Sequence, residues 1–232
     1  MQITYINHSG FMLELEHVWM LFDYYNGEIP PIPSGKQGFV FASHRHPDHF
    51  NPEIFQLASE GEISFILSGD IWKKRVPDAV KAQTVHMKPD TELELNGIRI
   101  QTLRSTDEGV AFLVQAEGKT IYHAGDLNHW RWEEESDEWN AQMEKDFHAY
   151  IEPLRNKKID VAFLPLDPRQ EAYYALGMDY FLELTETRKV YPMHFWGKPE
   201  IIKRWHEEHP DSIYRDRIVN VVQGGDTFYQ ES

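Results

Sequence analysis

The sequence predicts a mixed α/β protein of the α+β type, in which mixed β-sheets are covered by helices. Two patterns indicate this class. In the first half, short apolar runs are joined by turn residues, which is typical of strands paired as hairpins. In the second half, strand-like runs alternate with helical segments. Because no linker-like stretch divides the chain, we expect one domain over residues 1–232.

The first half is expected to hold mostly strands. Apolar runs bounded by turn residues predict strands at Gln2–Asn7, Phe11–Glu14, Trp19–Phe22, Phe39–Ala42, Ile63–Leu67, Glu92–Leu95, Ile98–Leu103, Val110–Ala116 and Thr120–His123. Asn96-Gly97 is a strong hairpin signal, and Glu117-Gly118-Lys119 indicates a second hairpin. A proline- and glycine-rich loop is expected over 26–38. Asn51 as N-cap and Pro52 at the first position predict a helix to about Ala58.

The second half is expected to alternate helices and strands. The run 133–138 holds five acidic residues in six positions, and we interpret it as the solvated start of a helix that continues to about Arg155. Further helices are predicted at Met178–Thr187 and Lys198–His206. Further strands are predicted at Val161–Pro165, Val190–Met193, Ile218–Val222 and Thr227–Tyr229.

Composition limits the function classes. The 232 residues include 23 basic and 38 acidic side chains, a net charge of −15, with twelve histidines and no cysteine. The absence of cysteine excludes disulfides and thiolate metal sites, and the negative charge disfavours nucleic-acid binding. The amino terminus does not resemble a signal peptide, and no apolar run approaches the roughly 20 residues that span a bilayer. We therefore expect a cytoplasmic protein without a membrane span; the oligomeric state stays open.

Four potential metal ligands follow the apolar run Phe39–Ala42, in the segment Ser43-His44-Arg45-His46-Pro47-Asp48-His49. In extended chain, residues i and i+2 share a face, so His44 and His46 point the same way. Pro47 holds His46 in the extended region. Imidazole and carboxylate ligands together suit Zn²⁺, Mn²⁺ or Fe²⁺, and adjacent pairs can serve two ions.

The spacing His44-x-His46-x-Asp48-His49 resembles the signature of the metallo-β-lactamase superfamily, and the order of elements is similar along nearly the whole chain. The resemblance implies a four-layer αββα sandwich with a metal site where the two sheets meet. It implies that His44 and His46 serve one ion, and Asp48 and His49 the other. It further implies a bridging ligand at Asp126, in Gly125-Asp126, and a last ligand at His194, after Val190–Met193.

One position departs from the family pattern. The family usually carries a histidine before the strand predicted at Val110–Ala116, and that position falls on Ser105. Asp107 is a conceivable carboxylate replacement. Three protein ligands plus solvent still suffice for catalytic zinc, whereas a carboxylate-rich site would favour Mn²⁺. An incomplete first site could also leave the protein mononuclear or inactive.

Four further residues are candidates near the site. His8 resembles a position near the active site in the lactonase-like branch of the superfamily, the alternative being a hydrogen-bonded turn histidine. Asp23 could orient a ligand histidine. His123 and His129 flank Asp126 in the chain and could contact substrate, while Trp130 and Trp132 near His129 could instead be core or lid residues.

The leading functional hypothesis is a metal-dependent hydrolase that acts on a small molecule. It would hold Zn²⁺, with two ions expected and Mn²⁺ or Fe²⁺ as alternatives. A metal-bound hydroxide, formed with Asp48 or the bridging environment as proton acceptor, would attack an ester or lactone, an amide or a phosphodiester. The alternative is a non-catalytic or weakly active ligand-binding protein on the same scaffold, with an incomplete first metal site. A redox or nuclease member is a third and less favoured hypothesis.

Overall fold

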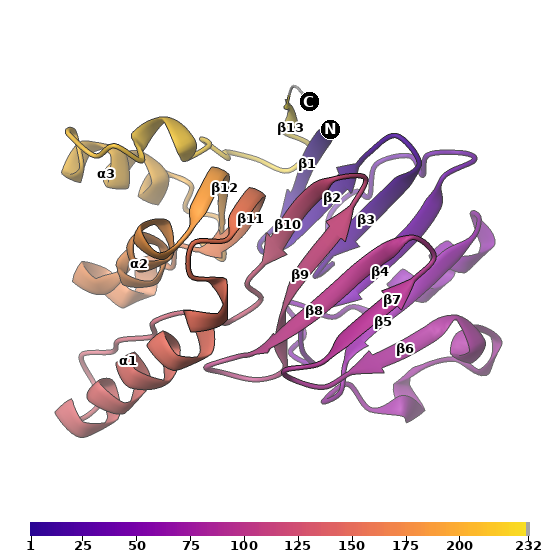
Figure 1. The fold of residues 1–232 in the computed structure, drawn as a ribbon, viewed down its shortest axis with the longest axis horizontal. Helices are drawn as coiled ribbons and strands as arrows, with labels where there is room; N and C mark the ends of the chain where they lie inside the picture. Colours follow the sequence, from indigo (N-terminus) through magenta and orange to yellow (C-terminus); the bar gives the residue numbers. More distant parts are fainter. Residues whose placement is uncertain (231–232) are drawn as a thin grey trace.

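The computed structural model describes residues 1–230, which form two mixed β-sheets flanked by helices. The first sheet has the strand order β13-β1-β2-β3-β4-β5-β6, and the second has the order β12-β11-β10-β9-β8-β7. In Figure 1 the α-helices gather on one side of the molecule, next to β11 and β12. The expectation of two mixed sheets covered by helices is confirmed.

The strands divide between the two sheets, and the helices connect or follow them. The first sheet consists of β1 (Gln2–Asn7), β2 (Gly10–Glu14), β3 (Val18–Phe22), β4 (Gln37–Ala42), β5 (Ile63–Ser68), β6 (Thr84–Met87) and β13 (Thr227–Tyr229). The second consists of β7 (Glu92–Leu95), β8 (Ile98–Arg104), β9 (Val110–Ala116), β10 (Lys119–His123), β11 (Lys158–Pro165) and β12 (Glu186–Met193). The helices are α1 (Asp137–Ile151), α2 (Leu176–Leu184) and α3 (Glu200–Glu208), with 3₁₀ helices at η1 (Pro52–Ser59), η2 (Lys73–Arg75), η3 (Asp78–Gln83), η4 (Glu152–Leu154), η5 (Pro168–Tyr173) and η6 (Arg215–Arg217).

Strand direction brings several loops to one edge of each sheet. β3 to β6 run parallel to one another, and β1 has the same direction because two antiparallel pairings separate it from β3. In the second sheet, β10, β11 and β12 are parallel, and β8 shares their direction by the same argument. The carboxyl ends of β1, β4, β8, β10 and β12 therefore open onto common edges.

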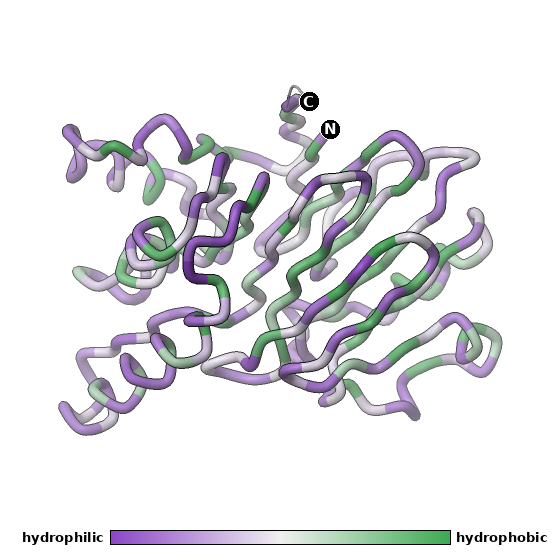
Figure 2. The backbone as a smooth tube through the Cα atoms, viewed as in Figure 1, coloured by the Kyte–Doolittle hydropathy of each residue, from purple (hydrophilic) through white to green (hydrophobic). Residues whose placement is uncertain are grey.

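The core lies between and around the two sheets. Alternate side chains of the first sheet, such as Ile3, Phe22 and Phe41, are fully buried against the second sheet and the α-helices. The outer face of the first sheet packs on the 3₁₀ helix η1 through Ile54 and Phe55. Figure 2 shows that many of the apolar stretches follow the strands. No helix within residues 1–230 is long and apolar enough to cross a membrane.

Most predicted elements are confirmed, including both hairpins. Asn96 and Gly97 have the positive φ values, 46° and 84°, that a tight hairpin turn of this sequence requires. Asn51 caps η1 by accepting the N–H of Glu53 (2.9 Å), as the sequence predicts, although this helix is 3₁₀ rather than α.

Two predictions about elements were wrong, and one strand was not predicted. The helix expected at Met178–Thr187 ends at Leu184, because Thr185 caps it and the next residues already pair with β11. The strand expected at Ile218–Val222 is absent from the described chain. A single bridge joins Ile218 to Val190 there, and Asp226 closes a turn by accepting the N–H of Val222. Strand β6 was missed, because its four residues pair only with β5 at the sheet edge.

Candidate metal centre

The loops at these common edges bring eight potential ligands into two adjacent groups. Within each group, one possible ligand atom per residue lies within 4.8 Å of all the others. The first group, called here cluster 1, consists of His44, His46, Asp107 and Asp126. The second, cluster 2, consists of His8, Asp48, His49 and His194. All six residues expected as ligands are therefore close together, and Asp107 and His8 join them.

Asp126 lies between the two clusters. Its Oδ1 faces Nε2 of His49 (3.2 Å) and of His194 (3.4 Å), and its Oδ2 faces Nε2 of His44 (3.5 Å). Burial acts to raise the pKa of Asp126, but the three facing histidines hold it well below its ordinary value. The residue is thus an ionised carboxylate with one oxygen toward each cluster.

Several buried nitrogen and oxygen atoms at the centre have no hydrogen-bond partner within residues 1–230 of the protein. Among the described residues, Nε2 of His8, His49 and His194 and Oδ1 of Asp126 are buried and make no hydrogen bond. An unsatisfied buried polar atom costs on the order of 1–3 kcal/mol. Three ring nitrogens and a carboxylate oxygen that converge without hydrogen bonds between them fit a bound cation.

Asp23 fixes the orientation of two of these histidines. Its Oδ2 accepts from His49 Nδ1 (2.7 Å) and from Ser43 Oγ (2.6 Å). Because Ser43 gives its only hydroxyl proton to Asp23, His44 Nδ1 donates to Ser43 Oγ (2.9 Å). Both histidines thereby turn Nε2 toward the clusters, where Nε2 of His44 is hydrogen-bonded to Nδ1 of His46 (3.0 Å).

Asp167 orients His194 in the same way, and the sequence analysis missed it. Its Oδ2 accepts from His194 Nδ1 at 3.0 Å, and Arg169 Nε reaches both of its oxygens at 3.0 and 2.9 Å. Burial acts to raise the pKa of Asp167, but His194 and Arg169 lower it to about 2. The available signal was a carboxylate in Leu166-Asp167-Pro168, directly after a strand parallel to β10.

Cluster 1 is the more exposed of the two. The side chains of His46 and Asp107 are 39% and 44% exposed, whereas His8, His49 and His194 are buried. Ser105, where the family pattern places a histidine, is buried, and its hydroxyl accepts the N–H of Asp107 (3.1 Å). This places Asp107, rather than Ser105, beside His46 Nδ1 (3.7 Å).

Cluster 2 has strained backbone at two of its histidines. His8 and His194 have positive φ values of 54° and 63°, which is uncommon for residues other than glycine. His8 Nε2 lies 3.3 Å from Asp48 Oδ2. Burial acts to raise the pKa of Asp48, but His8 and His49 hold it well below its usual range.

The two histidines expected near substrate do not line the central pocket. His123 is fully buried, donates from Nε2 to Ser9 O (2.9 Å) and accepts the N–H of Gly125 (3.1 Å) at Nδ1. It therefore supports the turn that carries Asp126. His129 is also buried and packs against Phe147, with ring centroids 5.8 Å apart.

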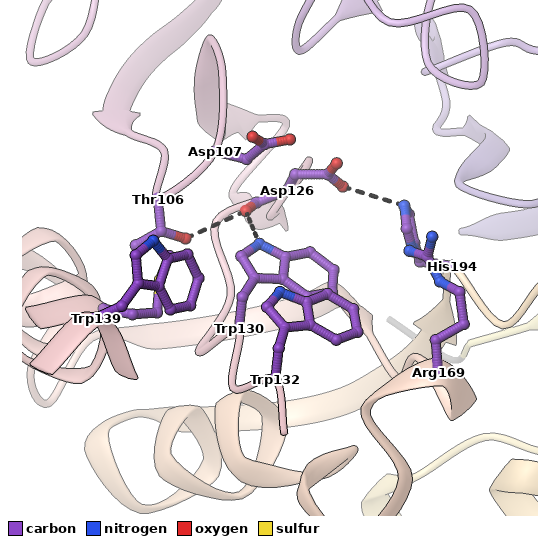
Figure 3. Close-up of a pocket in the computed structure, with 9 residues that line it drawn as sticks. Thr106, Asp107, Asp126, Trp130, Trp132, Trp139, Arg169 and His194 are labelled. Atoms are coloured by element: carbon purple, nitrogen blue, oxygen red, sulfur yellow. Dashed lines mark hydrogen bonds and ion pairs between the residues drawn. The ribbon is translucent and has the colours of Figure 1, made fainter. Parts of the chain in front are cut away.

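Tryptophans line the pocket beside the clusters instead. Figure 3 shows Trp130, Trp132 and Trp139 below Asp107 and Asp126, with His194 and Arg169 at one end. Trp130 is fixed by its indole N–H, which donates to the backbone oxygen of Asp126 (2.9 Å). The pocket thus combines metal-ligating groups with an aromatic wall.

Comparisons with known proteins agree with this geometry. Residues 2–142 match the model of the β-lactamase superfamily domain. A UPF0173 metal-dependent hydrolase from Opitutus terrae is 26% identical over 98% of this chain and 99% of its own. One from Pyrococcus furiosus is 22% identical over 86% of this chain and 87% of its own.

Solved structures share the fold. The metallo-β-lactamase fold protein YhfI from Bacillus subtilis superposes with a TM-score of 0.64 at 14% identity, covering 98% of this chain and 99% of its own. The metallo-hydrolase Igni18 from Ignicoccus hospitalis gives 0.63 at 19% identity, covering 99% of each chain.

Proposed function

This chain belongs to the β-lactamase superfamily, and from that premise we propose that it is a metal-dependent hydrolase in which each cluster holds one divalent cation. The observation that carries the proposal is the convergence of buried polar atoms without a hydrogen-bond partner in the described chain, Nε2 of His8, His49 and His194 and Oδ1 of Asp126. The orientation of these histidines by Asp23 and Asp167 supports it, because ligand histidines usually donate their second ring N–H to such a group.

We propose Zn²⁺ as the ion of cluster 2, where three imidazoles and the Asp48 carboxylate suit its preferences. Cluster 1 offers two imidazoles and two carboxylates, because Asp107 stands in for the missing histidine. This harder ligand set would accept Mn²⁺ or Fe²⁺ more readily than cluster 2.

Bound cations would supply Lewis acidity, which polarises a carbonyl or phosphoryl oxygen and lowers the pKa of water. The chain's own residues supply position and proton transfer. Asp48, an ionised carboxylate with 22% of its side chain exposed, is the proposed acceptor of a proton from the attacking water. Hydrolysis then forms one bond to the water oxygen and breaks the bond to the leaving group, which receives a proton. An ester or lactone, an amide and a phosphodiester are all compatible with this chemistry.

Metal analysis tests the proposal. We expect protein purified without chelator to hold about two ions per chain, measured by inductively coupled plasma mass spectrometry. His194→Ala removes a cluster 2 ligand and should lower the content toward one ion, whereas His17→Ala, at an exposed histidine outside both clusters, should leave it unchanged. Well under one ion per chain in the unmodified protein would contradict the proposal and favour a non-catalytic binding protein.

A further inference from the structure

The pocket beside the clusters has one wall of flat apolar side chains. Trp130, Trp132, Trp139 and Met143 line it, and we call these four residues the aromatic wall. The rings of Trp130 and Trp132 are nearly parallel, with planes 4° apart and centroids 5.8 Å apart. Since Trp130 donates to the backbone of Asp126, the wall is held directly against the group that faces both clusters.

The backbone at Trp132 and Trp139 is also held by hydrogen bonds. The side-chain amide of Asn140 makes two hydrogen bonds to Trp132: it accepts the backbone N–H (3.0 Å) and donates to the backbone oxygen (2.8 Å). Ser136 caps α1 by accepting the N–H of Trp139 (3.2 Å). These bonds fix the backbone at Trp132 and Trp139, so less backbone ordering entropy is lost when a ligand binds.

Arg169 closes the other end of the pocket without offering a free charge. Its Nε and Nη2 face the carboxylate of Asp167, so the pair is locally neutral. Its guanidinium lies 5.7 Å from the ring centroid of Trp132 and 4.6 Å from that of Trp196. A planar guanidinium in this position adds a further stacking surface rather than an anion site.

An acidic segment joins two residues of the aromatic wall. The exposed segment 133–138, Glu-Glu-Glu-Ser-Asp-Glu, connects Trp132 to Trp139, so five acidic residues lie between two residues of the aromatic wall in the chain. The whole chain carries a net charge of −15. Such a field lowers the local concentration of anions and leaves neutral molecules unaffected.

From these features, and resting on the proposed function, we propose that the substrate is an uncharged carbonyl compound, an ester, lactone or amide, that carries a flat aromatic group. The aromatic group stacks on Trp132, and the carbonyl group lies beside Asp126 and His194. The acidic segment and the net charge of −15 disfavour a phosphodiester, which is an anion. In the reaction, the water oxygen bonds to the carbonyl carbon, the C–O or C–N bond breaks, and a proton passes to the departing alcohol or amine.

Matched substrates test the preference on the metal-loaded protein. Methyl 3-phenylpropanoate and methyl 3-cyclohexylpropanoate share one scissile bond and differ only in the ring, which is flat and aromatic in the first and puckered and saturated in the second. We expect kcat/KM to be about tenfold higher for the phenyl ester, in line with aromatic stacking. Bis(4-nitrophenyl) phosphate, an aromatic anion, should be the poorest of the three despite its better leaving group.

Variants separate the aromatic wall from general effects. Trp132→Ala should remove most of the phenyl preference with the metal content unchanged, and Trp132→Phe should restore much of it. Trp72→Ala is the matched control, because Trp72 is 55% exposed and lies outside the pocket. Equal rates for the two esters, a phenyl preference that survives Trp132→Ala, or preferred cleavage of the phosphodiester would overturn this inference and leave the hydrolase proposal standing.

If none of the three substrates is hydrolysed, that result counts against the proposed function. The aromatic-group inference is then tested by a binding measurement. Tryptophan fluorescence should show 3-phenylpropanamide, an uncharged probe, binding to the unmodified protein about tenfold more tightly than to Trp132→Ala. No binding, or tighter binding of tetramethylammonium than of the amide, would overturn the inference, the latter in favour of a site for organic cations.

Discussion

At the scale of single residues, the centre depends on pairs in which one side chain faces the clusters and another fixes its orientation. Asp23 serves His49 directly and His44 through Ser43, and Asp167 serves His194. Each contact settles which ring nitrogen carries the proton, so the other nitrogen is available as a ligand. The orienting residues should therefore affect metal affinity without contacting a metal.

Asp167→Asn tests this dependence. The amide cannot accept the His194 N–H as strongly and cannot pair with Arg169, so we expect metal affinity at cluster 2 to fall about 10- to 100-fold. Zinc titration against a competing chelator measures the change. Asp78→Asn is the control, because Asp78 is exposed and pairs with Lys81 away from both clusters. Equal affinities for the two variants would show that Asp167 does not orient His194.

Two glycines with similar backbone conformation, one at a close contact and one in open space, test how closely the loops after β4 and β8 pack beside the metal centre. Gly109 and Gly118 have φ values of 70° and 73°. A Cβ at Gly109 would lie 2.0 Å from the backbone oxygen of Ser43, whereas nothing lies within 4 Å of a Cβ at Gly118. Gly118→Ala should therefore cost only the backbone strain, about 1–2 kcal/mol.

Gly109→Ala should cost more than Gly118→Ala, since Ser43 and His44 must also move. Urea unfolding at fixed pH gives both free energies of unfolding. If the two variants are equally stable, the loops after β4 and β8 are not packed as closely as the structure indicates.

At the scale of elements, one carboxylate joins the two sheets. Glu117, in the turn between β9 and β10, accepts the backbone N–H groups of Glu16 (2.9 Å), His17 (2.8 Å) and Val18 (3.0 Å) in the β2–β3 turn. These contacts fasten a turn of the second sheet to a turn of the first. The bonds lie at the surface, which limits the contribution of each.

Glu117→Ala removes all three acceptor contacts. We expect the free energy of unfolding to fall by about 1–3 kcal/mol, because hydrogen bonds to a charged acceptor contribute more than neutral ones. Glu16→Ala is the control, since the Glu16 side chain is 82% exposed and only its backbone takes part. Chemical denaturation compares the two, and a loss no larger than that of the control would argue against the connection.

The elements also show what the sequence could not predict. Hairpins were predictable because turn residues such as Asn96-Gly97 act locally. The start of β12 was not, since Glu186 joins a strand only through its pairing with Lys158. The wrong strand at Ile218–Val222 has the same origin, because β-pairing depends on partners distant in sequence.

At the scale of the whole molecule, stability should depend on pH through histidines that the fold keeps neutral. Burial lowers the pKa of His86, His129 and His206, which all lie outside the two clusters. A lowered pKa means that the unfolded chain takes up protons that the folded chain does not. Stability from these groups is present above about pH 6.5 and is lost as the pH falls below it.

Chelator-treated protein should therefore lose stability as the pH falls from about 7.5 to 5.5, measured as the free energy of unfolding in urea. His206→Gln should reduce the size of this loss, because one group whose pKa is lower in the folded than in the unfolded chain is removed. His17→Gln, at an exposed site, should not reduce it. An unchanged pH dependence in His206→Gln would show that burial does not keep this histidine neutral.

The sequence by itself determined the chemistry and the chain positions of the expected ligands. Histidine and aspartate in the spacing of His44 to His49, after a buried strand, indicate a metal site locally, and the lack of cysteine limits its ligands to nitrogen and oxygen. Only the tertiary structure decided how these residues divide into two clusters. It also placed His8 beside His194, Asp107 beside His46, Asp167 behind His194, and the tryptophans along the pocket. These relations join residues on different strands, and pairing between strands far apart in sequence is set by the packing of the whole fold rather than by any local pattern.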